Sequence, residues 1–99
     1  METSELKLIP GRRIVPVVAQ LGGIKINLYY NEDHGPPHVH VWCDDDHWTW
    51  IAIETLELLG DAIPAKCYRA VREWMEPRRD QLMESWHQAR QGQRVRRIP

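Results

Sequence analysis

The 99-residue chain contains no phenylalanine and only two cysteines. Five tryptophans supply much of its aromatic content. Because indole is large and has a polar edge, we expect some of these side chains to remain partly exposed rather than to fill a small core. Two cysteines are too few for a disulfide framework, so we expect Cys43 and Cys67 to be buried, reduced thiols.

Long apolar runs are also missing. No run approaches the roughly 18 residues that a membrane-spanning helix needs, and residues 1–10 lack the features of a secretory signal. We therefore expect a cytoplasmic protein that does not associate with membranes. The chain has no internal repeat, and its length suits one domain. We predict a flexible N-terminal arm over residues 1–12 and a single α+β domain over residues 13–99.

Lysine and arginine are absent from residues 31–61, which carry eight acidic residues. Residues 62–99 carry nine basic and four acidic residues, a net charge of +5, although the whole chain is at −1. Either the two segments compensate each other within the fold, or the basic end meets an anionic partner. The first interpretation is favoured, because formal charge alone is weak evidence about partners.

Alternating apolar and polar residues predict a small antiparallel sheet in the first half of the chain. In residues 24–30 the alternation places Lys25, Asn27 and Tyr29 on one face. A hairpin over residues 38–53 places two histidines and three tryptophans on one face and mainly branched apolar side chains on the other. With an extended edge segment at residues 14–21, we expect three to four strands in total.

The second half of the chain is predicted to be helical. From Pro64 onwards, apolar residues recur at helical spacing up to Ala89, and Gly92 provides a stop. Pro77 removes one backbone hydrogen bond, so we expect a kink or a second helix that begins near Glu76. The predicted fold class is therefore α+β: a small antiparallel sheet followed by a long, kinked amphipathic helix or by two consecutive helices.

Three histidines and a carboxylate lie close together in the sequence, around a pair of prolines. Imidazole and carboxylate groups bind divalent metals such as zinc, and histidine also acts as a general acid or base. His34, His38 and His40 are thus candidate catalytic residues, and together with Asp33 they are candidate metal ligands. The competing interpretation is that these histidines only hydrogen-bond to turns and form a half-exposed polar face. It is favoured, because no second set of ligands appears at standard spacing.

Two further groups are candidates for binding. Trp42, Trp48 and Trp50 share the predicted non-core face of the hairpin and are candidate interface residues, since tryptophan is enriched at binding hot spots. The alternative is that they serve only packing, as we expect for Trp74 and Trp86 on the helical stripe. The candidate anion-binding residues are Arg90, Arg94, Arg96 and Arg97.

Several short motifs occur in an order that is similar to that of a known family. They are Gly23-Ile24-Lys25-Ile26, Tyr29-Tyr30-Asn31, Asp33-His34-Gly35-Pro36-Pro37-His38-Val39-His40, Ile53-Glu54-Thr55-Leu56-Glu57, Ile63-Pro64, Glu73-Trp74, Leu82-Met83-Glu84-Ser85-Trp86 and Arg97-Ile98-Pro99. From about residue 16 to residue 99 the chain thus resembles the small prokaryotic proteins of the domain of unknown function 4160 family. It departs from them at Val39, where the family more often has phenylalanine, and at Pro77, which interrupts a helix that is usually unbroken.

The resemblance implies a compact α+β domain of bacteria and mobile elements. It also implies a protein that is often encoded beside another small protein, the two being proposed as a toxin–antitoxin pair. We therefore expect a cytoplasmic protein-interaction or regulatory module with a small protein partner encoded nearby, and self-association stays open. The alternative is a metal-binding hydrolase or ribonuclease-like toxin that uses the histidines. A second alternative is nucleic-acid binding through the basic C-terminal tail.

Overall fold

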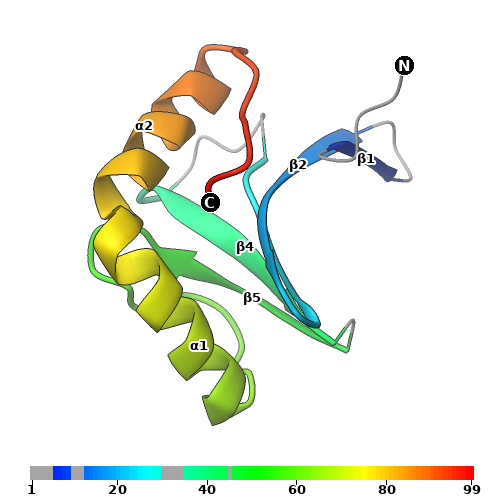
Figure 1. The fold of residues 1–99 in the computed structure, drawn as a ribbon, viewed down its shortest axis with the longest axis vertical. Helices are drawn as coiled ribbons and strands as arrows, with labels where there is room; N and C mark the ends of the chain where they lie inside the picture. The colour runs from blue at the N-terminus through cyan, green and yellow to red at the C-terminus, as the bar shows by residue number, and fades with distance from the viewer. Residues whose placement is uncertain (1–5, 10–12, 30–34, 45) are drawn as a thin grey trace.

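The computed structural model describes residues 6–9, 13–29, 35–44 and 46–99. Its strands form an antiparallel sheet in which sequence order is also spatial order (Figure 1). The four strands β2–β5 make up the body of the sheet, as predicted, and β1 extends it by pairing with the first half of β2. The strands are β1 (Leu6–Ile9), β2 (Arg13–Leu21), β3 (Ile24–Asn27), β4 (His38–Cys43) and β5 (His47–Ala52).

Strand β1 lies within residues 1–12, where a flexible arm was expected. Leu6 pairs with Pro16 and Ile9 with Arg13, so this part of the expected arm is a strand. The sequence alone did not indicate it, because four residues are too few to establish an alternating pattern.

The helices follow the sheet in the sequence and lie on one side of it (Figure 1). They are α1 (Ala65–Met75), the short 3₁₀ helix η1 (Glu76–Arg78) and α2 (Arg79–Arg90). Pro77 lies within η1, so the predicted break occurs where its missing N–H prevents a regular α-helical bond. The α+β fold class with a kinked helical segment is thereby confirmed.

The core lies between the helices and one face of the sheet. On β4 this face carries Val39, Val41 and Cys43, which are all buried. The opposing helical stripe is also buried, from Cys67 in α1 to Leu82 in α2. Alternation in the strands and helical spacing after Pro64 therefore produce one continuous apolar layer.

Cys43 and Cys67 are joined by a disulfide bond, with their Cα atoms 6.6 Å apart. The prediction of two separate reduced thiols is therefore wrong for this structure. Cys43 ends β4 and Cys67 lies in the first turn of α1, so the bond joins the sheet directly to the helix. Composition did not indicate this pairing, because it depends on α1 packing over the last residue of β4.

Residues 93–99 form an extended tail that returns from α2 towards the sheet (Figure 1). Gly92 has a φ of 76°, which allows the chain to reverse after α2. Val95 and Ile98 are buried, and the Ile98 N–H donates a hydrogen bond to the Val18 carbonyl oxygen of β2 (2.8 Å). Among the described residues, no helix combines the length and the apolar character needed to cross a membrane.

Candidate functional site

Strands β4 and β5 bring aromatic side chains together on the sheet face opposite the one that carries Val39, Val41 and Cys43. Their register places Trp42 opposite Trp48 and His40 opposite Trp50. Tyr29, just after β3, adds a further ring beside His40, at a centroid distance of 4.1 Å. We call these five residues, Tyr29, His40, Trp42, Trp48 and Trp50, the aromatic strip.

The rings of the aromatic strip form a connected series of contacts. The His40 and Trp50 rings are stacked, with centroids 5.5 Å apart, and the Trp42 and Trp48 rings are stacked at 5.9 Å. The Trp48 and Trp50 rings connect these two stacked pairs, with their centroids 6.4 Å apart. Distances of this kind are favourable for aromatic pairs, so each indole is held in position by its neighbours.

Exposure increases along the aromatic strip. His40 is buried, Trp42 and Trp50 are partly buried, and Trp48 is 49% exposed. The backbone around Trp50 is also closely packed: Gly60 lies so near its ring that a Cβ atom at residue 60 would overlap it. The aromatic strip therefore presents one large apolar side chain to solvent from a rigid support.

His38 lies next to the aromatic strip but is itself buried (2% exposed). Its ring packs against the rings of Trp50 and Trp86, with centroid separations of 5.2 Å and 5.0 Å. Its Nδ1 lies 2.8 Å from the Pro36 carbonyl oxygen. A carbonyl only accepts, so Nδ1 carries a proton, and in the neutral ring Nε2 therefore holds the lone pair.

The predicted metal site is only partly covered by the structure. Asp33 and His34 lie outside the described residues. The rings of His38 and His40 have centroids 5.2 Å apart, so the structure does bring two of the candidate ligands together. Within the part of the chain that is described, no group of three or more His, Cys, Asp or Glu residues is placed to hold a metal ion.

One polar neighbour of the histidines was not singled out in the sequence. Asn27 of β3 pairs in register with His40 and is 3% exposed. Its Oδ1 atom is buried and has no hydrogen-bond partner among the described residues. The alternation in β3 already placed Asn27 on this face, but nothing in the sequence indicated that it would be buried beside a histidine.

Trp86 was expected to serve only the helical stripe, and it does belong to the core cluster. It also contacts His38, which links α2 to the edge of the aromatic strip. This contact joins residues 48 positions apart in the chain, so no local pattern predicts it.

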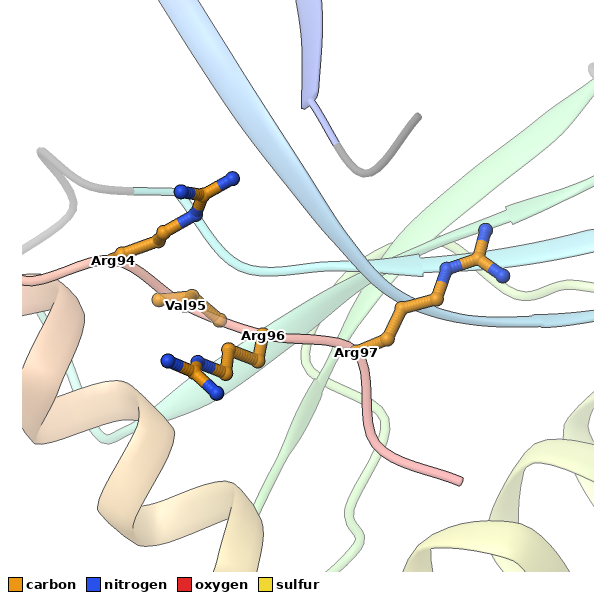
Figure 2. Close-up of a pocket in the computed structure, with 4 residues that line it drawn as sticks. All are labelled: Arg94, Val95, Arg96 and Arg97. Carbon is orange, nitrogen blue, oxygen red and sulfur yellow. The ribbon is translucent and has the colours of Figure 1, made fainter. Parts of the chain in front are cut away.

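The four candidate anion-binding arginines fall into two groups. The Arg90 guanidinium lies over the Trp86 ring, 5.5 Å from its centroid, and so takes part in packing. Arg94, Arg96 and Arg97 lie on the extended tail and are exposed. They line a surface hollow of about 400 Å³ together with Val95 (Figure 2).

Most of the strands and helices described above lie within the domain of a known family. The family model described as "Domain of unknown function (DUF4160)" matches residues 23–87, which is well over half of the chain and includes β3, β4, β5 and α1. No curated protein and no solved structure matches the chain. On the strength of the family match, the chain belongs to the DUF4160 family, whose defining domain has no known function.

Proposed function

We propose that this protein is a small interaction module that binds a protein partner through the aromatic strip, as one component of a toxin–antitoxin-type or mobile-element pair. The observation that carries the proposal is the 49% exposure of Trp48 on a rigid, stacked support. Tryptophan is the residue most typical of binding hot spots, and such residues are most effective when they are already held in place.

The energy available at Trp48 is sufficient to matter for binding. Covering the exposed half of an indole removes on the order of 100 Å² of apolar surface from water, which is worth about 2–3 kcal/mol. This corresponds to a change of about 30-fold or more in affinity. Trp42 and Trp50 then act by orienting Trp48 and by adding the edges of their own rings.

The surroundings of Trp48 indicate the character of the partner. Asp44, Asp46 and His47 are exposed in and beside the β4–β5 turn, next to the Trp42–Trp48 pair. A partner that covers Trp48 therefore meets an apolar centre with an acidic rim. We expect it to carry an apolar pocket flanked by lysine or arginine, and its association rate to fall as salt is added.

The test is co-expression with the small protein whose gene adjoins this one, followed by calorimetric titration of the two purified proteins. Trp48→Ser should weaken the complex by about 30-fold or more. Met83→Ser is the matched control, because Met83 is a partly buried apolar residue of α2 and is not part of the aromatic strip. Equal affinity of both variants, or no complex with the wild-type protein, contradicts the proposal.

If Trp48 instead serves self-association, the outcome differs. Light scattering would then show a dimer of the wild-type protein alone, and Trp48→Ser would convert it to a monomer. That result would keep the aromatic strip as the interface but replace the neighbouring protein by a second copy of this chain.

A metal-binding hydrolase or ribonuclease-like activity is the second candidate, favoured by one observation. The bond from His38 Nδ1 to the Pro36 carbonyl selects the tautomer in which Nε2 binds a metal or accepts a proton. His38 and His40 are 2% and 5% exposed, so a substrate would need the site to open. Elemental analysis of the purified protein, and RNA cleavage by wild type and His40→Gln, test this candidate; cleavage that is lost in the variant would place it first.

A further inference from the structure

We propose that the C-terminal tail binds the phosphodiester backbone of a nucleic acid through Arg94, Arg96 and Arg97, which we call the arginine segment. The proposal goes beyond the protein-interaction function, because the tail is separate from the aromatic strip in sequence and arises from different elements. The arginine segment also lies outside residues 23–87, which are the residues that the family model matches.

The backbone of the arginine segment is held at both ends. At its start, the Gln93 N–H donates to the Gln88 carbonyl oxygen (2.8 Å). At its end, Ile98 is bonded to β2, and Arg78 Nε donates to the Pro99 carbonyl oxygen (2.8 Å). Val95 is buried at 2% exposure between the arginines. A segment fixed in this way loses little conformational freedom when it binds a ligand.

The three guanidinium groups are available for a ligand. Arg94, Arg96 and Arg97 are exposed, and none of them makes an ion pair with a carboxylate within the described part of the chain. In Figure 2, Arg94 and Arg97 extend to one side of the segment and Arg96 extends to the other side, towards α2. Guanidinium groups bind phosphate oxygens in a bidentate manner, so the segment presents phosphate-binding groups on both of its sides.

The neighbouring surface also fits phosphate. A second hollow, of about 460 Å³, lies between the arginine segment and α2. Amide side chains contact nucleic-acid phosphates alongside arginine, and three of them line this hollow. Among the described residues that line this hollow, Glu84 is the one carboxylate and none is aromatic. The lining from α2 and the start of the tail comprises Gln81, Glu84, Ser85, Gln88 and Gln93.

This composition separates a nucleic acid from an acidic protein segment as the ligand. A protein segment needs an apolar centre for its binding energy, whereas the two hollows that Arg94 and Arg96 line consist mainly of arginine and amide groups. Of the three arginines, Arg97 is the one that also lines an apolar hollow, beside Trp74. Among the described residues, neither of the two hollows that Arg94 and Arg96 line contains an aromatic side chain on which a base could stack. The contact is therefore to the backbone, and binding is independent of base sequence.

The charge distribution supports the same choice. Residues 78–99 contain six arginines and two acidic residues, a net charge of +4. In Figure 1 the start of the tail, next to α2, lies away from the connection between β4 and β5.

Fluorescence anisotropy with labelled 20-nucleotide RNA, single-stranded DNA and duplex DNA of mixed sequence tests the proposal. The variant Arg94→Gln, Arg96→Gln, Arg97→Gln should bind at least tenfold more weakly than wild type at low salt. Three phosphate contacts predict a slope of about −2 for log K against log salt on single strands, hence about a 20-fold loss of affinity for a fourfold rise in salt. The RNA and DNA arms identify which nucleic acid is preferred.

Two controls make the result specific. The variant Lys66→Gln, Arg69→Gln, Arg72→Gln removes the same charge from exposed positions of α1 and should bind nucleic acid like wild type. Trp48→Ser should also bind nucleic acid normally, so failure of the protein-interaction proposal and failure of this one are distinguishable. If the triple arginine variant does not fold, the single variants Arg94→Gln and Arg97→Gln replace it, each with a loss of about threefold or more.

Three results would overturn the proposal. The first is no binding of any oligonucleotide by wild type at low salt. The second is equal loss in the arginine and α1 variants, which would indicate only a general charge effect. The third is that poly-glutamate of equal length binds as tightly and with the same dependence on the arginines, which would make the ligand an acidic protein segment.

Discussion

Trp48 stacks on Trp42 across the β4–β5 pair, with ring centroids 5.9 Å apart, and yet it is 49% exposed. The stacking restricts the rotamers of an indole that solvent alone would leave free. A large apolar side chain that is both ordered and exposed loses little entropy when a partner covers it. The combination of stacking and exposure at Trp48 is therefore the basis of the proposed interface.

The contact between Gly60 and Trp50 predicts that Gly60→Ala is destabilising. A Cβ atom at residue 60 would overlap the Trp50 ring and lie 2.7 Å from Thr49 Oγ1, so β5 or the residue 60 loop must shift. We expect the free energy of unfolding to fall by about 1–3 kcal/mol, together with a change in near-ultraviolet circular dichroism. Urea unfolding and dichroism measure the two effects.

Gly22→Ala is the control for that variant. Gly22 has open space around its Cβ position and a φ of 62°, so its substitution costs only backbone strain of about 1 kcal/mol. Its dichroism should match the wild type. If Gly60→Ala keeps wild-type stability and dichroism, Trp50 is not held as described.

The disulfide between Cys43 and Cys67 predicts a stability that depends on reducing agent. The bond closes a loop over a sequence separation of 24 residues, for which chain entropy gives about 3.5 kcal/mol of stabilisation. Cys67→Ser, or wild type with reductant, should therefore unfold at lower urea concentration. Alkylation of the unfolded, unreduced protein checks the bond itself: no free thiol is expected, and two alkylated cysteines would contradict the linkage.

Because His38 is buried, we predict that its main role is in packing. His38→Ala removes a ring at 2% exposure that contacts Trp50 and Trp86 and bonds to Pro36. We expect a loss of about 3 kcal/mol, measured by urea unfolding in the presence and absence of a chelator. A wild-type stability that falls to the level of the variant when chelator is added would instead show that His38 holds a metal.

We predict that replacing Arg78 loosens the C-terminal tail. It donates hydrogen bonds to the carbonyl oxygens of Trp74 and Pro99 and lies over the Trp74 ring, 4.9 Å from its centroid. Arg78→Ala should lower stability by about 1–2 kcal/mol and speed trypsin cleavage after Arg94, Arg96 and Arg97. Arg72→Ala removes a similar side chain over Tyr68 without touching the tail. If the two variants are cleaved at the same rate, Arg78 does not hold the tail.

Much of the fold was predictable because it depends on short-range periodicity. The alternation in residues 38–53 indicated the hairpin, and the spacing after Pro64 with the break at Pro77 indicated the helical segment. The placement of Trp42, Trp48 and Trp50 on one face follows from the same period of two. These features need no knowledge of which elements pack together.

The features that the sequence did not indicate depend on contacts between distant elements. The bond between Cys43 and Cys67 requires α1 to cross the end of β4. The contact of Trp86 with His38 requires α2 to reach the start of the same strand. Strand β1 was too short for a pattern, and the candidate ligands Asp33 and His34 lie outside the described residues, so the metal hypothesis stays a prediction.

The most direct measurement of the central claim is hydroxyl-radical footprinting, read by mass spectrometry, of the protein alone and in complex with the proposed small protein partner. We predict that Trp48 is readily oxidised in the free protein, because it is 49% exposed, and is strongly protected in the complex. Met83, as the internal reference, should be oxidised at the same rate in both. A complex in which Trp48 is oxidised as fast as in the free protein, while another surface is protected, would contradict the account.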